Sequence, residues 1–176
     1  MMTLVTGRSD SGKSEFAENL VLKDGFSRRY YIATMLVMNE EAVSRRERHR
    51  KSRRGKGFET LEIPCLIDAA PSLMADPKNC SVLLECVANL VGNIMHSDEW
   101  EKRIKNASAE TVDDLSDNIV RLITDLASSV GNLTVVSLVC DDESDKTGDE
   151  ETKLYLFILD NVNRRLSRIA DKVYNL

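Results

Sequence analysis

The chain lacks the features of a membrane or secreted protein. None of its apolar runs approaches the ~18 residues that a membrane span needs. Its start, MMTLVTG, has neither a basic n-region nor a long apolar stretch, so no secretory signal is indicated. None of the four cysteines belongs to a C-x-x-C pair, so neither a zinc site nor a thioredoxin-like motif is indicated. We therefore expect a cytoplasmic protein without a membrane span, whose cysteines are small buried residues.

Internal repeats and low-complexity linkers are also missing. The 176 residues are 42% hydrophobic and 30% charged, which is typical of a globular protein. This length suits one domain with a core of its own, and we expect a single domain over residues 1–176.

Positive charge is concentrated in one segment. The chain has a net charge of −5, yet residues 45–56 carry eight Lys or Arg against one acid, so this segment is +7 and the remainder is −12. A protein that binds nucleic acid usually has a broad basic face, so this distribution argues against a nucleic-acid partner. It favours local recognition of a polyanion such as a nucleotide phosphate.

Buried strands alternate with helices along the sequence. Apolar and β-branched runs predict strands at 3–6, 29–34, 58–63, 81–87, 133–139 and 172–175. Helical periodicity predicts helices at 12–23, 65–75, 88–105, 109–130 and 152–170, with an acidic loop at 140–151. Segment 39–54 has no apolar stripe and should be exposed if it is helical. This order predicts an α/β fold, a mostly parallel sheet flanked by helices.

The stretch GRSDSGKS, residues 7–14, matches the phosphate-binding pattern G-x-x-x-x-G-K-[ST]. Its glycines let backbone N–H groups point at phosphate oxygens, and the following helix directs its positive end at the anion. Lys13 is expected to act as a catalytic residue on the β- and γ-phosphates, and Ser14 to ligate Mg²⁺. The motif lies between a predicted strand and a predicted helix, which indicates a P-loop NTPase-type sheet. The expected contacts with ATP or GTP are Gly7, Arg8, Ser9, Asp10, Ser11, Gly12, Lys13 and Ser14.

Glu85 ends the apolar run SVLLE, where a P-loop protein usually carries the acid that orients the Mg²⁺ shell. A strand-end acid that faces solvent is the plainer alternative, and the pattern is weak by itself. Together with the P-loop it favours a second metal-side ligand.

His49 is one of two histidines and lies inside the basic segment. Three interpretations are compatible with this position: an exposed residue on a solvated helix, a bystander in a patch that binds phosphate or nucleic acid, or a nucleophile. As a nucleophile, the imidazole would attack a nucleotide α-phosphate and release pyrophosphate, while the surrounding cations stabilise the developing charge. The spacing alone does not choose among the three.

Taken in order, these motifs resemble the adenosylcobinamide kinase/adenosylcobinamide-phosphate guanylyltransferase family. The likeness covers nearly the whole chain. It comprises the P-loop, YIAT (31–34), EEAVSRRERHR (40–50) with an R-x-x-x-H spacing, LLEC (83–86) followed by Asn93, VNRRL (162–166) and ADKVY (170–174). Many families share the P-loop, whereas its combination with R-x-x-x-H is much more specific.

The resemblance implies two reactions of cobalamin biosynthesis. The first phosphorylates the hydroxyl of the aminopropanol arm of adenosylcobinamide with ATP or GTP, and the second transfers GMP from GTP to that phosphate through an adduct on His49. It also implies Mg²⁺, a corrinoid partner, and assembly into a homo-oligomer such as a trimer. Further positions that match nucleotide contacts of the family are Ala33, Thr34, Met35, Arg50, Lys51, Ser52, Arg53, Glu62 and Glu85.

Two segments differ from the family pattern. Arg8 and Asp10 stand where the family usually has a second Gly and an Arg, and CDDESDKTGDEE (140–151) replaces a T-N-E-V-G-x-G segment. Two alternatives therefore stay open: a catalytically altered or inactive nucleotide-binding protein on the same fold, and a small-molecule kinase with another acceptor.

Overall fold

The computed structural model describes residues 1–36, 40–105, 107–140 and 149–176, in which six strands form one sheet. The strands are β1 (Met2–Gly7), β2 (Arg28–Ala33), β3 (Phe58–Glu62), β4 (Cys80–Glu85), β5 (Asn132–Leu138) and β6 (Lys172–Asn175). Their spatial order is β3-β2-β4-β5-β1-β6, and the pairings among them are parallel. One strand, β5, therefore lies between β1, which precedes the P-loop, and β4, which ends at Glu85.

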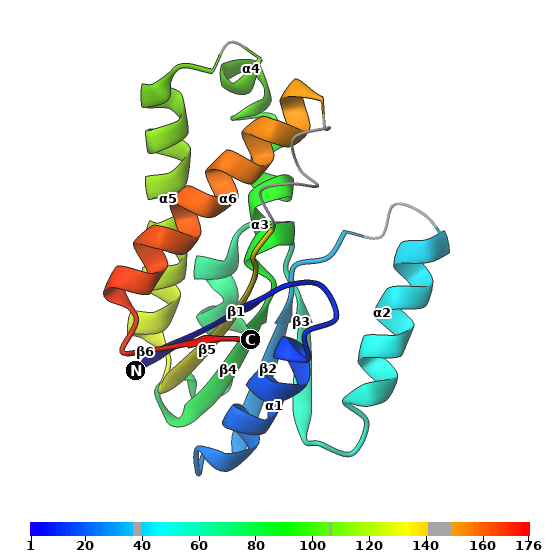
Figure 1. Cartoon of the computed structure of the whole chain (residues 1–176). Helices are drawn as coiled ribbons and strands as arrows, with labels where there is room; N and C mark the ends of the chain where they lie inside the picture. The colour runs from blue at the N-terminus through cyan, green and yellow to red at the C-terminus, as the bar shows by residue number, and fades with distance from the viewer. Residues whose placement is uncertain (37–39, 106, 141–148) are drawn as a thin grey trace.

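Helices cover both faces of this sheet (Figure 1). They are α1 (Lys13–Lys23), α2 (Glu40–Ser52), α3 (Val87–Met95), α4 (Glu101–Ile104), α5 (Ala109–Ser129) and α6 (Glu150–Ile169), with 3-10 helices over Ile67–Leu73 and Pro77–Asn79. α1 packs on one face, and α3, α5 and α6 pack on the other. Figure 1 shows α5 and α6 side by side, and α2 at the other side of the molecule near β3. The side chains of residues 41, 42, 45, 49 and 52 of α2 are not described.

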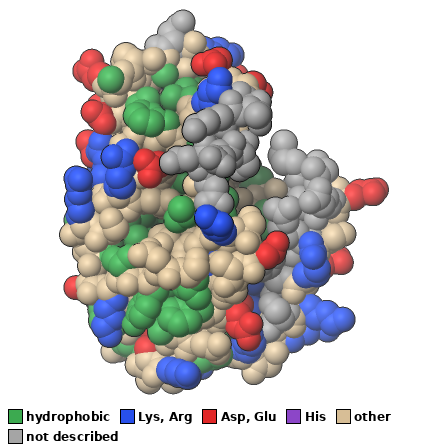
Figure 2. All heavy atoms as spheres, viewed as in Figure 1, with side chains coloured by type: hydrophobic (Ala, Val, Ile, Leu, Met, Phe, Trp, Pro, Cys, Tyr) green, Lys and Arg blue, Asp and Glu red, His purple; other side chains and the backbone are tan. Residues whose placement is uncertain are grey.

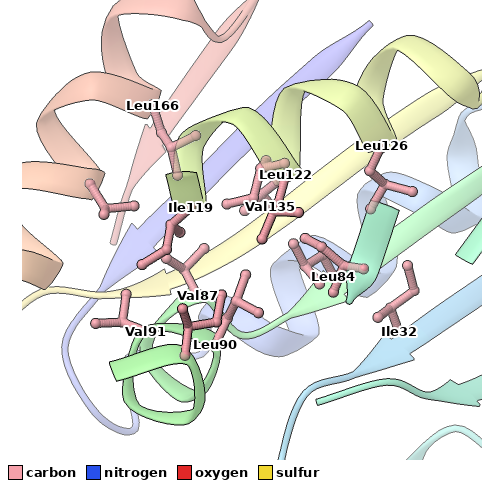
Figure 3. Close-up of a cluster of buried hydrophobic side chains, with 14 of the residues drawn as sticks. Ile32, Leu84, Val87, Leu90, Val91, Ile119, Leu122, Leu126, Val135 and Leu166 are labelled. Carbon is pink, nitrogen blue, oxygen red and sulfur yellow. The ribbon is translucent and has the colours of Figure 1, made fainter. Parts of the chain in front are cut away.

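The larger core lies between the sheet and α3, α5 and α6, and Figure 3 shows part of it. Ile32, Leu84 and Val135 point into this core from three neighbouring strands. Their neighbours Tyr31, Leu83 and Val136 point to α1 instead, because successive side chains of a strand alternate between faces. Since β4 and β5 are covered on both sides, their continuous apolar sequences match their position at the centre of a parallel sheet.

The predicted α/β architecture is confirmed. Each predicted strand is present with ends that differ by no more than two residues. The long helix predicted over 109–130 is α5, whose first turn is capped by the Ser108 hydroxyl accepting from the Thr111 N–H. Among the described residues, no helix is long and apolar enough to cross a membrane.

The single helix predicted over 88–105 is wrong in its middle. α3 ends at Met95 and α4 begins only at Glu101. Ser97 donates from both its backbone N–H and its hydroxyl to the Ile94 carbonyl, at 3.0 and 2.7 Å. These bonds satisfy a carbonyl at the end of α3 and turn the chain, which is the competition between Ser side chains and helical hydrogen bonds.

Two other boundaries also differ from the predictions. The helix predicted over 65–75 is a 3-10 helix, Ile67–Leu73, that contains Pro71. α6 begins at Glu150 rather than residue 152, because the Asp149 carboxylate accepts from the Thr152 N–H at 2.8 Å and caps it. The predicted acidic loop is therefore shorter at its end, and its residues 141–148 lie outside the described part of the chain.

Candidate functional site

A cavity of about 830 Å³ lies at the carboxyl edge of the sheet. It is where β2, β4 and β5 end and where the loop after β1 turns into α1. Parallel α/β sheets bind ligands at this edge. The lining residues are Ser9, Asp10, Gly12, Lys13, Ser14, Glu15, Tyr31, Ala33, Met35, Arg46, Arg48, Arg53, Glu85, Cys86, Ala88, Asn89, Val136, Leu138 and Tyr155.

The two P-loop glycines have different structural reasons. A Cβ on Gly7 would lie 2.5 Å from Ser11 Oγ and 2.8 Å from the Leu176 carbonyl oxygen, so a side chain cannot be accommodated without movement. Gly12 lies at φ +83° just before α1, in the left-handed region that glycine adopts without steric cost. The loop therefore depends on one close approach and one special backbone angle.

Lys13 and Asp10 bring opposite charges to this loop. Lys13 donates from Nζ to the Arg8 carbonyl oxygen at 2.7 Å, which keeps its amine against the loop. Asp10 has a φ of 59° and is exposed. Because Asp tolerates this region better than most residues, the acid in the loop is compatible with the turn, and its exposure leaves it hydrated.

Glu85 is the central carboxylate of the cavity. Only 9% of this residue is exposed. Its Oε1 accepts from the Ser14 hydroxyl, and its Oε2 accepts from the Tyr31 hydroxyl at 2.6 Å. The interpretation of Glu85 as a solvent-facing acid is therefore wrong.

Tyr31 holds this carboxylate from the α1 side of the sheet. Burial, followed by the Glu85 charge, raises the pKa of Tyr31 well above its ordinary value, so at neutral pH its hydroxyl is a donor. The guanidinium of Arg53 lies 3.4 Å from the centroid of the Tyr31 ring, a close cation–π contact. Phe58 packs edge-on against the same ring. These contacts fix one oxygen of Glu85 and leave the other facing Ser14.

Arg53 contradicts the expectation that the basic segment is exposed. α2 ends at Ser52, and the chain then turns Arg53 onto Tyr31, so only 6% of this residue is exposed. Its Nε and Nη1 have no hydrogen-bond partner among the described residues. Buried guanidinium N–H groups are costly without acceptors, and an anionic oxygen in the cavity would supply them.

Ion pairs fasten the basic segment to the rest of the protein. Lys56 pairs with Glu18 of α1, which is 4% exposed. Arg50 pairs with Glu62 at the end of β3, and Arg46, which also lines the cavity, lies 3.8 Å from the same carboxylate. Figure 2 shows Lys and Arg side chains gathered on the side of the molecule where α2 lies. The segment is thus tied to both α1 and β3.

The end of β2 separates three residues that the resemblance groups together. Ala33 and Met35 line the cavity, whereas Thr34 is fully buried and points elsewhere. The Thr34 hydroxyl donates to the Cys86 carbonyl and accepts from the Cys86 N–H, at 2.9 and 2.8 Å. Asn93 donates to the carbonyls of Thr34 and Pro64, at 2.6 and 2.9 Å. Thr34 and Asn93 therefore hold strand ends together beneath the cavity.

Ser14 and Glu85 are the described groups that could hold Mg²⁺. Both are hard oxygen donors, which this ion prefers, and they are in direct contact. No group of three or more His, Cys, Asp or Glu side chains that could hold a metal occurs among the described residues. A nucleotide-dependent Mg²⁺ site needs fewer, because substrate phosphates and water supply the remaining ligands.

The structure brings together only part of the predicted site. Ser9, Asp10, Gly12, Lys13, Ser14, Ala33, Met35, Arg53 and Glu85 line the cavity, and Gly7 and Ser11 support the loop beneath it. Five other predicted site residues that the structure describes lie outside the lining: Arg8, Thr34, Arg50, Lys51 and Glu62. The side chains of His49 and Ser52 are not among those described, although both positions belong to α2.

Sequence reasoning missed most of the residues that line the cavity on the side of α3 and α6. Cys86, Ala88, Asn89, Leu138 and Tyr155 come from the start of α3, the end of β5 and the first turns of α6. The signal that could have found them is position. The start of α3 comes just after β4, and Leu138 ends β5, so both lie at the ligand-binding edge of a parallel sheet. Tyr31 carries a weaker signal, because it is two residues before Ala33 on the same strand and therefore shares its face.

A parallel sheet with a glycine-rich loop between β1 and α1, and a carboxylate in contact with the loop serine, defines an α/β protein of the P-loop NTPase type. The model of the cobinamide kinase / cobinamide phosphate guanyltransferase family matches residues 3–176, and the chain belongs to this family. The resemblance noted from its sequence motifs is confirmed at the level of the family.

Two relatives are bifunctional adenosylcobalamin biosynthesis proteins. The chain is 37% identical over 108 residues to the bifunctional adenosylcobalamin biosynthesis protein CobU of Escherichia coli (strain K12), covering 57% of this chain and 58% of that protein. It is 34% identical over 95 residues to CobU of Salmonella typhimurium (strain LT2), covering 54% of this chain and 50% of that protein. The chain thus matches about half the length of these relatives.

Among solved structures, the chain was matched to the crystal structure of the flagellar accessory protein FlaH from Methanocaldococcus jannaschii. The match has a TM-score of 0.37 and 13% identity, and covers 90% of this chain and 67% of that one. A likeness this weak supports no inference about function.

Proposed function

We propose that this protein is a bifunctional cobinamide kinase and cobinamide-phosphate guanylyltransferase, with His49 as the GMP acceptor. The observation that carries the proposal is the convergence on one cavity of the P-loop, Glu85 and Arg53, whose Nε and Nη1 have no hydrogen-bond partner among the described residues, in a chain of this family. Each of these groups meets a need of polyphosphate chemistry: backbone donors, a metal-side carboxylate and a buried cation.

In the kinase reaction, the hydroxyl oxygen of the aminopropanol arm bonds to the γ-phosphorus of ATP or GTP. The bond from that phosphorus to the bridging oxygen breaks, the nucleoside diphosphate leaves, and the hydroxyl proton passes to water. Lys13 and Arg53 are the cations that would hold the polyphosphate, and Ser14 and Glu85 would hold Mg²⁺. The ion would supply neutralisation of the phosphate charge.

In the transferase reaction, an imidazole nitrogen of His49 attacks the α-phosphorus of GTP and pyrophosphate leaves. A phosphate oxygen of cobinamide phosphate then attacks the phosphorus of the adduct, the P–N bond breaks, and adenosylcobinamide-GDP leaves a free histidine. Position 49 is three residues after Arg46 on α2, so the two positions share a helix face. Because Arg46 lines the cavity, this face of α2 borders it, which supports the choice of position 49 as the acceptor.

The test is a covalent adduct. Wild-type protein incubated with GTP and Mg²⁺ should gain the mass of GMP, in a bond that breaks in acid and survives alkali, as a phosphoramidate does. His49→Asn should abolish the adduct and keep GTP binding, whereas Lys13→Ala should lose the rise in melting temperature that GTP causes. His96→Asn is the matched control: His96 caps the end of α3 and its Nε2 lies 3.2 Å from Glu151 Oε1, so its loss should leave the adduct unchanged. Absence of any adduct on the wild type would end the transferase proposal.

A nucleotide-binding protein without activity is the second candidate. The observation that favours it is the sequence CDDESDKTGDEE at 140–151, in place of the family's T-N-E-V-G-x-G segment. This candidate expects ATP or GTP to raise the melting temperature without any adduct or phosphorylated corrinoid. Labelled ATP with adenosylcobinamide distinguishes the two, because only the kinase transfers label to the corrinoid.

A further inference from the structure

The two sides of the cavity differ in charge. Lys13 belongs to α1, and Arg46, Arg48 and Arg53 come from α2 and the residue just after it. These elements lie on the side of the sheet to which Tyr31 points, since Arg53 stacks on that ring and the segment after α2 is paired to α1. The cations therefore form one wall of the cavity.

The opposite wall carries no charged side chain among the described residues that line it. Cys86, Ala88, Leu138 and Tyr155 pack against the core on the α3 and α6 side of the sheet. The Tyr155 hydroxyl donates to the Ala88 carbonyl at 3.2 Å, and burial raises the pKa of this phenol above its ordinary value. This wall is both neutral and largely apolar.

Asn89 supplies the free polar group of the neutral wall. It lies in the first turn of α3, is half-buried, and its side-chain amide has no hydrogen-bond partner among the described residues. Asn93, one turn later, has its amide committed to the carbonyls of Thr34 and Pro64. An uncommitted amide can donate and accept, and so it can satisfy a hydroxyl or an amide of a ligand.

The geometry points to this neutral wall, with Asn89 as its polar residue, as the binding site of the aminopropanol arm of the corrinoid acceptor. The inference rests on the proposed function and names residues for its acceptor. The arm carries an amide, a hydroxyl and a short apolar chain. A wall that is apolar except for one polar side chain can contact the apolar chain and hydrogen-bond the amide or the hydroxyl.

The position of the wall also suits an acceptor. A polyphosphate held by the cationic wall exposes the far side of its terminal phosphate to the wall opposite. In-line displacement requires the attacking hydroxyl to approach from that far side. The neutral wall offers the phosphates no cation among the described residues. The cationic wall would therefore bind the nucleotide, which is the phosphoryl donor, and the neutral wall the phosphoryl acceptor.

The experiment measures acceptor and nucleotide separately in two variants. Asn89→Ala should raise the KM and the Kd for adenosylcobinamide about 3- to 10-fold, the effect of one net hydrogen bond. Leu138→Phe, which fills the apolar part of the wall, should raise both by at least as much. The Kd for ATP, measured without acceptor, should stay as in the wild type for both variants. Asn118→Ala, on α5 and outside the cavity lining, is the control and should change neither ligand.

The outcomes separate the two proposals. Wild-type protein that binds adenosylcobinamide without phosphorylating it would end the kinase proposal, while the variants would still test the wall through Kd. Unchanged acceptor Kd in both variants would overturn the assignment of the wall. Equal losses of ATP and acceptor affinity would also overturn it, because the wall would then hold the nucleotide base. A melting temperature near that of the wild type shows that a variant is folded. Because the two substitutions lie in different elements, one variant still tests the wall if the other fails to fold.

Discussion

Tyr31→Phe tests whether the phenol positions Glu85, because it removes one hydroxyl and keeps the ring under Arg53. The lost bond, 2.6 Å long, is donated to a carboxylate that is 9% exposed. Hydrogen bonds to charged groups contribute about 1.5–3 kcal/mol. For a chain of this size each kcal/mol shifts the melting temperature by about 2–4 °C, so we expect a decrease of about 3–12 °C.

The more specific consequence concerns metal binding. Groups that orient a metal ligand typically contribute about 10- to 100-fold to metal affinity. Without the Tyr31 hydroxyl, Glu85 still accepts a hydrogen bond from the Ser14 hydroxyl but loses the bond that fixes its second oxygen. We expect the affinity of the protein–ATP complex for Mn²⁺, a paramagnetic substitute for Mg²⁺, to decrease about tenfold or more. ATP binding in EDTA should stay close to that of the wild type.

Tyr30→Phe is the matched control, one residue away on the same strand. Tyr30 points to the other face of the sheet, and its hydroxyl accepts from the Ala75 N–H at 3.1 Å. Its loss should lower stability by about 0.5–1.5 kcal/mol, as for a neutral hydrogen bond, and leave Mn²⁺ affinity unchanged. Electron paramagnetic resonance of free Mn²⁺ gives the affinity directly. If Tyr31→Phe binds Mn²⁺ as tightly as the wild type, the hydroxyl does not position the metal-side carboxylate.

Two further predictions follow from the loop and from the buried phenols. Gly7→Ala should lower the melting temperature and weaken ATP binding in a thermal-shift assay, because its Cβ would lie 2.5 Å from Ser11 Oγ; Gly92→Ala, whose Cβ would meet its nearest neighbour at 3.8 Å, should leave ATP binding unchanged. The pKa values of Tyr31 and Tyr155 are raised by folding, so their contribution to stability is complete below the ordinary tyrosine pKa of 10.0 and is lost as pH rises above it. Urea unfolding between pH 9 and 11 should show stability decreasing with pH in this range, less steeply in Tyr31→Phe, and equal slopes would contradict the assignment.

The strands could be predicted because their signal is local. The runs SVLLE and LTVVSL are mostly apolar, and a strand covered on both faces requires this. The break between α3 and α4 could not be predicted in the same way. The helical pattern of residues 88–105 continues across it, and the deciding hydrogen bonds of Ser97 compete with the helix only weakly at the level of sequence.

The candidate site divides along the same line. Residues of the P-loop carry their spacing in the sequence, and Glu85 is marked by a strand end. Asn89 and Tyr155 are 66 positions apart, and they share a cavity only because α3 and α6 pack on the same face of the sheet. Strand order decides that proximity, and strand order is not a property of any short stretch. The contact of Tyr31 with Glu85 likewise depends on β2 lying beside β4.

The basic segment shows why charge counting locates a site but does not describe it. Its eight cations predict a polyanion, and an isolated exposed cluster would be screened within ~8 Å at physiological ionic strength. Arg53 escapes this screening because it is buried on Tyr31, whereas Arg50 is occupied by Glu62. The cations of one segment therefore differ in role: some fasten α2 to the sheet, and a buried one keeps donors unpaired at the cavity. Because a buried N–H loses more without an acceptor than an exposed one, Arg53→Ala should weaken ATP binding more than Arg54→Ala, its exposed neighbour, and equal effects in a titration would contradict this argument.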